Sequence, residues 1–274
     1  MSSCSGNCGS CSESCSDRKD KQSFLVEPNP MSSIKKVIGV VSGKGGVGKS
    51  LVTGTLASQL QRAGLKTAIL DADITGPSIP KMFGLKEQAY GTSAGLYPCK
   101  TSNGIDVMSV NLIIDDEKTP LIWRSGLICG AVKQFWTDVI WEDIDCMFID
   151  MPPGTGDVPL TVFQSIPIDG IIIVSTPQDL VSMIVSKAVN MAKKMDIPIL
   201  GIVENMSYFK CPDCGKEHHI FGIGSTEKTA KEFGLDIIAT VPIDPEVAQK
   251  CDMGKADDID AYWFNDTVEL IKKL

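Results

Sequence analysis

Short runs of apolar residues alternate along the chain with longer stretches of helical periodicity. The first run, residues 37–41, is followed by a glycine-rich turn and a helical pattern over residues 50–63 that ends at Gly64. Strand-like runs recur at 67–70, 106–110, 146–149, 171–175, 199–203 and 237–241, and helical patterns begin at Pro120 and cover 180–195 and 226–233. Near-continuous apolar strands between helices are typical of a parallel sheet buried on both faces. We therefore expect one doubly wound α/β domain with a mostly parallel sheet and an insertion near residues 205–222.

The two ends of the chain depart from this alternation. Residues 1–33 are rich in serine, cysteine and charge and carry too few apolar residues for a core, so we expect a disordered cysteine-rich tail before a domain spanning residues 34–274. Residues 262–274 are amphipathic, but their only basic residues are Lys272 and Lys273. A membrane-surface anchor usually has a strongly basic polar face. We expect this stretch to pack on the domain as a helix, without stable membrane association.

Composition and charge narrow the classes of function. The chain has 274 residues, with a formal net charge of −8, and 43% of them are hydrophobic. An acidic balance is the opposite of what a surface that coats nucleic acid needs, so we expect no nucleic-acid partner. No apolar run approaches the roughly 18 residues of a spanning helix, and no secretory signal is recognisable. We expect a cytoplasmic protein.

A phosphate-binding motif follows the first predicted strand. Residues 43–50 read Gly-Lys-Gly-Gly-Val-Gly-Lys-Ser and open a predicted helix, which is the context that the phosphate loop (P-loop) requires. Glycines let backbone N–H groups approach phosphate oxygens, and a helix N-terminus favours an anion. We expect Lys49 to reach the β- and γ-phosphates and Ser50 to ligate Mg²⁺. The predicted nucleotide-binding residues are Gly43, Lys44, Gly45, Gly46, Val47, Gly48, Lys49 and Ser50.

Three aspartates stand at the ends of predicted strands. Asp71 and Asp73 follow the second strand, and Asp150 follows the strand 146–149. Ligands of open parallel sheets bind beyond the carboxyl ends of the strands, so these carboxylates should converge on the P-loop. We assign Asp150 and Asp71 to Mg²⁺ and Asp73 to the attacking water. Such aspartates can also simply cap turns, but the P-loop beside them favours the catalytic interpretation.

A cysteine pair, Cys211 and Cys214, stands in the predicted insertion. Structural disulfides are disfavoured in reducing compartments, and two thiolates at this spacing can face one metal, either zinc or an iron–sulfur cluster. His218 and His219 follow closely, so a zinc knuckle within one subunit is one alternative. The other is a cluster shared by two subunits, because a four-thiolate shell needs two such pairs.

A second group of cysteines lies in the predicted tail. It has the spacing C-x₃-C-x₂-C-x₃-C and consists of Cys4, Cys8, Cys11 and Cys15. Four thiolates in one segment could ligate a second cluster within one chain. A flexible thiol-rich tail that delivers or guards metal explains the same residues equally well.

Several motifs, taken in chain order, carry a family resemblance. The P-loop has an additional lysine, Lys44, as in the MinD/Mrp class of P-loop ATPases. The other motifs are D-x-D-x-x-G-P-S from Asp71, W-R at 123–124, D-x-P-P-G-T-G-D from Asp150, E-N-M-S-Y-F from Glu204, C-P-x-C-G from Cys211, I-F-G from Ile220 and P-I-D-P from Pro242. Between about residues 34 and 256 the chain thus resembles the Mrp/ApbC family of iron–sulfur cluster carrier ATPases.

The resemblance implies roles that the residues alone do not. In that family Lys44 would reach across a homodimer to the partner's nucleotide, which makes Lys44, Lys49 and Asp73 the catalytic residues. Asn205 would recognise adenine, and Pro242 would lie beside the base. Cys211 and Cys214 would bind a cluster, [4Fe–4S] in type, between two subunits.

The function implied by the resemblance is that of a weak ATP hydrolase that carries a cluster and transfers it to apo iron–sulfur proteins. Cluster assembly proteins would be further partners. The alternative is a positioning ATPase switch of the MinD/ParA type whose cysteine pair holds a structural zinc.

Overall fold

The structure is a computed structural model that describes residues 24–114, 124–178 and 182–274. The four cysteines of the predicted N-terminal group, Cys4, Cys8, Cys11 and Cys15, lie outside the described residues, as does Pro120, the expected start of a helix. The helix in that part of the chain is described from Ser125 onward.

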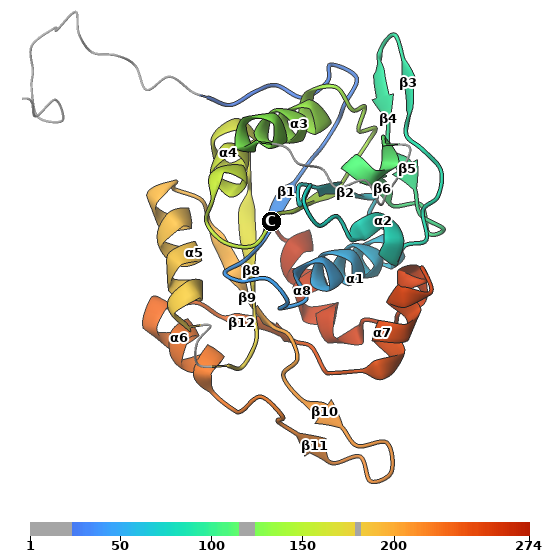
Figure 1. Ribbon diagram of the computed structural model, residues 1–274. Coiled ribbons are helices and arrows are strands. Elements are labelled where there is room, and N and C mark those ends of the chain that lie inside the picture. Colours follow the sequence, from blue (N-terminus) through green and yellow to red (C-terminus); the bar gives the residue numbers. More distant parts are fainter. Residues whose placement is uncertain (1–23, 115–123, 179–181) are drawn as a thin grey trace, which may run out of the picture.

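An eight-stranded sheet forms the centre of the molecule (Figure 1). Its strand order is β12-β9-β8-β1-β7-β2-β6-β5, and every pairing is parallel except that of β5 with β6. The strands are β1 Val37–Ser42, β2 Thr67–Asp71, β5 Cys99–Lys100, β6 Asp106–Met108, β7 Cys146–Asp150, β8 Gly170–Ser175, β9 Ile199–Glu204 and β12 Ile237–Thr240. The prediction of a doubly wound, mostly parallel sheet is confirmed.

Helices cover both faces of the sheet. One face packs against α3 Ser125–Thr137, α4 Asp157–Ser165, α5 Ser182–Lys194 and α6 Ser225–Phe233. The other packs against α1 Lys49–Arg62, α2 Ile79–Met82, α7 Pro245–Asp252 and α8 Asn265–Lys272. Short 3₁₀ turns are η1 Val110–Leu112, η3 Ala256–Asp258 and η4 Tyr262–Phe264.

Strand β1 shows why the sequence carries apolar runs rather than alternation. All six of its residues are buried, with Val37 and Val41 in the core on one face and Ile38 and Val40 in the core on the other. Successive side chains of a strand point to opposite faces, so a strand between two helical layers needs apolar residues throughout. The C-terminal helix expected from its amphipathic pattern is present as α8, and its residues Val268 and Ile271 are buried against the domain.

The N-terminal boundary differs from the expected one at residue 34. The backbone N–H of Val26 donates to Ser165 O at 2.8 Å, and the Trp136 indole donates to Val26 O at 2.8 Å. Asn29 is buried and donates to Ala94 O at 3.1 Å. Residues 24–33 are therefore part of the folded domain, because their backbone groups find partners that composition alone does not report.

Two hairpins stand apart from the central sheet. One pairs β3 Tyr90–Thr92 with β4 Gly95–Tyr97, and the other pairs β10 Phe209–Lys210 with β11 Glu217–His218. The second, which we call the cysteine hairpin (residues 209–218), lies in the expected insertion and projects from the body of the molecule (Figure 1). Among the described residues, no helix is both long and apolar enough to cross a membrane.

Candidate nucleotide and metal-binding sites

The P-loop connects the carboxyl end of β1 to the first residue of α1. Gly46 and Gly48 both have φ of +79°, a region that side-chain-bearing residues rarely adopt. A Cβ on Gly48 would also lie 2.1 Å from Asn205 Nδ2, whereas one on Gly46 would meet nothing within 4 Å. The loop backbone thus depends on glycine at both positions, for conformation at Gly46 and for conformation and space at Gly48.

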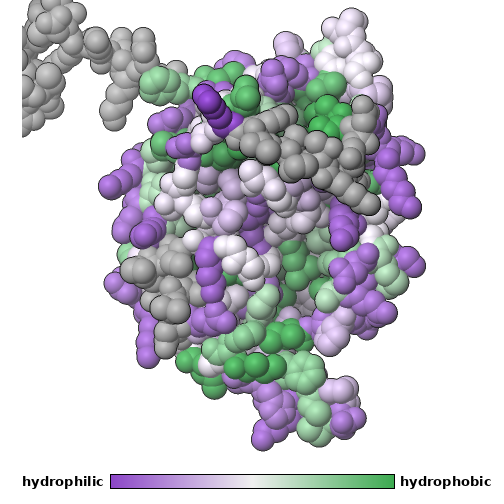
Figure 2. Space-filling model, viewed as in Figure 1, coloured by the Kyte–Doolittle hydropathy of each residue, from purple (hydrophilic) through white to green (hydrophobic). Residues whose placement is uncertain are grey.

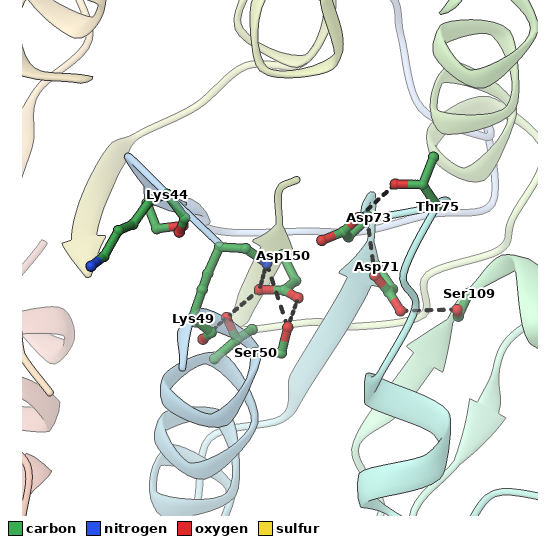
Figure 3. Close-up of polar contacts among 10 residues, drawn as sticks. Lys44, Lys49, Ser50, Asp71, Asp73, Thr75, Ser109 and Asp150 are labelled. Carbon is green, nitrogen blue, oxygen red and sulfur yellow. Dashed lines mark hydrogen bonds and ion pairs between the residues drawn. The ribbon is translucent and has the colours of Figure 1, made fainter. Parts of the chain in front are cut away.

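Asp150 is the centre of the polar network beneath this loop (Figure 3). It is fully buried at the end of β7, and one of its carboxylate oxygens lies 2.7 Å from Lys49 Nζ. Ser50 Oγ donates to it at 2.6 Å and Thr53 Oγ1 at 2.7 Å. Thr53 was not among the predicted site residues, although its spacing of four from Lys49 puts both on one helix face. Asp150 is therefore the ion-pair partner of the P-loop lysine, Lys49.

Asp71 and Asp73 complete a group of carboxylates around one lysine. Burial, together with the nearby charge of Asp150, raises the pKa of Asp71 to about 8. Asp71 accepts a hydrogen bond from Ser109 Oγ at 2.9 Å, and burial also raises the pKa of the half-buried Asp73. Several carboxylates sharing one cation favour a further cation. Because Ser50 Oγ and the Asp150 carboxylate are adjacent oxygen donors, these residues fit Mg²⁺.

Lys44 extends away from the three aspartates (Figure 3). Its Nζ donates to Gln178 Oε1, 2.7 Å away, beyond the end of β8. Sequence reasoning missed Gln178, and nothing in its sequence position signalled this contact. Within its own chain, Lys44 is thus directed away from the carboxylates that surround Lys49.

A cavity of about 510 Å³ lies over the P-loop. Its walls include residues 44–51 and Asp73, and α2 and α7 contribute Lys81 and Cys251 on its far side. A volume of several hundred cubic ångströms is typical of a small-molecule site. The cavity therefore combines the phosphate-binding loop with the aspartate that we assign to the attacking water.

Neither Asn205 nor Pro242 lines this cavity. Asn205 is buried beneath the loop, where its Nδ2 donates to Val47 O at 2.8 Å and its Oδ1 accepts from Met206 N at 2.9 Å. Pro242 belongs to a segment that pairs with residues 207–209, because Ile243 N donates to Tyr208 O at 2.7 Å. The Asn205 amide is thus hydrogen-bonded to the P-loop backbone.

The two cysteines of the CxxC motif lie at the turn of the cysteine hairpin. Cys214 is exposed and Cys211 is half-buried, and Gly215 N donates to Cys211 O at 2.9 Å. Hydrogen bonds from the backbone of Cys214 and Asp213 lower the pKa of the Cys211 thiol. A thiol whose pKa is lowered forms the thiolate that metals bind.

The neighbouring histidines do not join this pair. His219 Nδ1 lies 3.1 Å from Ser207 O, and His218 is in β11 opposite Phe209. Within the ranges that the structure describes, no group of three or more His, Cys, Asp or Glu side chains is placed to hold a metal ion. At the hairpin, the described part of the chain therefore offers two thiols and no third metal ligand.

Comparison with known proteins decides the family. A family model described as the NUBPL iron-transfer P-loop NTPase, of the ParA group, matches residues 33–271. This chain belongs to that family. The resemblance to cluster-carrier ATPases inferred from the motifs is thereby confirmed.

Two relatives are similar to this chain over most of their length. An iron–sulfur cluster carrier protein of Methanocaldococcus jannaschii is 47% identical over 261 residues, which cover 93% of this chain and 90% of the relative. A protein of the same name from Methanococcus maripaludis is 44% identical over 285 aligned residues and 98% of each chain.

Solved structures agree with the fold. A nucleotide-binding protein of Archaeoglobus fulgidus in complex with ADP has a TM-score of 0.76 and 43% identity, covering 85% of this chain and 91% of that one. The cell division ATPase MinD of Pyrococcus furiosus has a TM-score of 0.64 at 21% identity, covering 87% and 98%. At that identity the likeness to MinD concerns the fold alone.

Proposed function

We propose that this chain is an ATP-dependent iron–sulfur cluster carrier that holds its cluster between two copies of itself. The observation that carries the proposal is the cysteine hairpin, which presents two thiols and, among the described residues, no third ligand. A four-thiolate shell requires two such pairs. The names of the relatives from Methanocaldococcus jannaschii and Methanococcus maripaludis support the same function.

The P-loop residues supply the chemistry of ATP hydrolysis. Lys49 would exchange Asp150 for the β- and γ-phosphates, and Ser50 and Asp150 would hold Mg²⁺ together with Asp71. The metal ion, when bound, neutralises charge on the phosphate oxygens. Asp73 lines the same cavity and orients the attacking water, and its raised pKa suits a group that accepts a proton. Turnover is weak and serves to load or release the cluster.

Lys44 acts in the other subunit. Its ammonium points away from the carboxylates of its own chain, toward Gln178. A cation brought to the partner's nucleotide offsets the charge that grows in the transition state, as an arginine finger does. Dimerisation and hydrolysis are therefore coupled.

Two hydrogen bonds and the backbone between them join the P-loop to the segment that directly follows the cysteine hairpin. In the first, Asn205 Nδ2 donates to Val47 O, and Asn205 lies two residues before Ser207. Ser207 O in turn lies 3.1 Å from His219 Nδ1, on the segment that follows β11. For Asn205 to recognise adenine, its amide must leave Val47. Nucleotide binding thus changes the support of the segment that carries the thiols.

Apo iron–sulfur proteins receive the cluster, and cluster assembly proteins supply it. The exposure of Cys214 supports direct transfer, because an acceptor thiolate can then approach the bound cluster. The N-terminal group Cys4, Cys8, Cys11 and Cys15 takes part either as a second cluster site or as a metal-delivering tail.

Anaerobic reconstitution with iron and sulfide tests the proposal. The full chain is used with its four N-terminal cysteines replaced by serine, because deleting residues 1–33 would remove the packed segment 24–33. We expect about two irons per chain, which is one [4Fe–4S] cluster per dimer. Cys211→Ala and Cys214→Ala should each abolish this iron, whereas the control Cys129→Ala, in α3, should retain it.

Two results would contradict the carrier function. A cluster that survives Cys211→Ala would place the ligands elsewhere. One zinc per monomer, with no iron-dependent absorbance after reconstitution, would indicate an ATPase with a structural zinc ion. That result would favour the MinD/ParA-type switch.

A further inference from the structure

Another cavity lies at the edge of the sheet that is far from the cysteine hairpin (Figure 1). It has a volume of about 350 Å³ and is bounded by the hairpin of β3 and β4, by β5 and β6, and by residues 140–142 before β7. We call it the edge cavity. The cysteine hairpin follows β9, which lies beside the edge strand β12, whereas β5 is the edge strand at the other end. Seven strand spacings of about 4.8 Å, or roughly 34 Å, separate the two edge strands.

Two stacked tyrosine rings form one wall of the edge cavity. Tyr90 of β3 and Tyr97 of β4 are directly opposite in the antiparallel hairpin, so both side chains lie on one of its faces. Their ring centroids are 4.9 Å apart, their planes are 9° from parallel, and Tyr90 is 61% exposed. Figure 2 shows this hairpin as a pale, weakly polar projection above strongly hydrophilic surface. An exposed aromatic ring on a cavity wall is available to stack with a planar ligand.

Backbone hydrogen bonds hold the tyrosine pair in place. In β4, Leu96 N donates to Asp138 O and Leu96 O accepts from Ile140 N, both at 2.8 Å. Directly before β3, Ala89 N donates to Leu112 O at 2.7 Å. Both strands of the hairpin are thus tied to the body of the domain. The rings are positioned before any ligand binds, which lowers the entropic cost of binding.

The other walls carry an excess of carboxylates. Glu87 and Glu142 are exposed, Asp106 is buried, and Lys100 is the one cation among the described residues that line the cavity. Lys100 forms an ion pair with Asp106. Burial nevertheless raises the pKa of Asp106, so this ion pair does not fully offset the burial of the carboxylate. Three carboxylates against one ammonium leave an excess of negative charge, which favours a cationic ligand.

An arginine side chain matches both the rings and the charge. Its guanidinium is planar and always charged, stacks on aromatic faces and binds carboxylates through two N–H groups. A metal ion fits less well, because the carboxylates of this cavity do not form a group placed to hold one. The volume, smaller than the 510 Å³ of the nucleotide cavity, suits a single large side chain. A chain with a net charge of −8 also attracts a basic partner more than a second copy of itself.

We propose that the edge cavity is a docking site for a basic partner protein, which inserts an arginine side chain against Tyr90 and pairs it with Glu87 and Glu142. The docked partner leaves Cys211 and Cys214 accessible, because the cysteine hairpin is at the other end of the sheet. The site works in the same way whether or not a cluster is bound. Its test is therefore separate from the test of the proposed function.

Fluorine NMR of the full chain labelled with 3-fluorotyrosine tests the site. The chain has four tyrosines, and Tyr208 and Tyr262, which do not line the edge cavity, serve as internal references. The probe is N-acetyl-arginine amide, which presents the side chain without terminal charges. We expect the signals of Tyr90 and Tyr97 to shift along one saturation curve, while the two references stay in place. N-acetyl-citrulline amide has the same shape without the charge and should bind roughly tenfold more weakly.

Variants locate the bound probe. Glu142→Gln removes a charge from the cavity wall, and the control Glu232→Gln removes the same charge at an exposed position in α6. Glu142→Gln should bind the probe roughly threefold more weakly, which is the loss expected for one exposed ion pair, and Glu232→Gln should bind it as the wild type does. Tyr90→Leu keeps an apolar side chain without the ring and should weaken binding, read at Tyr97, by roughly threefold. Because Glu142 is exposed, its variant remains informative if Tyr90→Leu disturbs the hairpin.

Four results would overturn the inference. The first is the absence of a saturable shift at Tyr90. The second is equal binding of the arginine and citrulline probes. The third is wild-type affinity in both Glu142→Gln and Tyr90→Leu, which would place the bound arginine elsewhere. The fourth is tighter binding of free L-arginine than of the blocked probe, which would indicate a small-molecule site instead of a docking site for a protein side chain.

Discussion

Gly48 and Gly46 offer a direct measure of how tightly Asn205 is joined to the P-loop. Both have φ of +79°, so replacement by alanine costs each roughly 1–2 kcal/mol for left-handed backbone. Only the Cβ on Gly48 meets the Asn205 amide, at 2.1 Å. Displacing that buried amide breaks its bond to Val47 O and leaves polar groups unpaired, at a further cost of about 1–3 kcal/mol. We expect Gly46→Ala to lower the free energy of unfolding by roughly 1–2 kcal/mol and Gly48→Ala by roughly 2–5 kcal/mol.

Urea unfolding of the nucleotide-free chain, followed by circular dichroism, measures both losses as shifts of the midpoint at constant m. Repeating the pair in an Asn205→Ala background isolates the contact, because the clash partner is then absent and the two substitutions should cost the same. Equal losses in the wild-type background would refute the reasoning. So would a difference that persists without the Asn205 side chain.

Three further predictions concern the nucleotide site. Lys49→Ala should abolish ATP binding in calorimetry. Asp73→Ala should still bind ATP but lose phosphate release, because it removes the positioning of the attacking water and no phosphate contact. Normal hydrolysis by Asp73→Ala would disprove that assignment. Lys44→Ala should bind ATP and hydrolyse it more slowly. If Lys44 acts across the dimer, mixing this variant with Asp73→Ala should restore activity in the heterodimers. No rescue in confirmed heterodimers would mean that Lys44 acts within its own chain. Because the folded-state pKa of Asp71 is raised to about 8, the contribution of this group to stability is complete below its unfolded pKa and is lost as the pH rises through 8. In metal-free buffer, Asp71→Asn should therefore flatten the fall in unfolding free energy between about pH 4 and 8, and an unchanged slope would contradict the cause given for the shift.

The sequence predicted the sheet and the convergence of the nucleotide site because both depend on local signals. Buried strands read as apolar runs, and the end of each strand places its aspartate at one edge of the sheet. Lys49 and Asp150, about one hundred residues apart, meet for this reason at 2.7 Å.

The contacts of Asn205, Lys44 and residues 24–33 lay beyond such reasoning. Asn205 reaches Val47 across 158 residues of sequence, and Lys44 reaches Gln178 across 134. These partners depend on how packed elements sit against each other, which no local pattern encodes. Composition likewise did not reveal that residues 24–33 pack on the domain. A segment with few apolar residues can be held by backbone hydrogen bonds, such as that from Ser33 N to Trp141 O.

Native mass spectrometry of the reconstituted protein tests the central claim most directly. The sample is the full chain with Cys4, Cys8, Cys11 and Cys15 replaced by serine, so that only the cysteine hairpin can supply the expected ligands. A shared cluster predicts a dimer whose mass exceeds that of two chains by one [4Fe–4S] unit, and this species should disappear in Cys214→Ala. A monomer that carries one zinc ion, or a dimer that keeps its cluster without Cys214, would contradict the claim that two hairpins share one cluster.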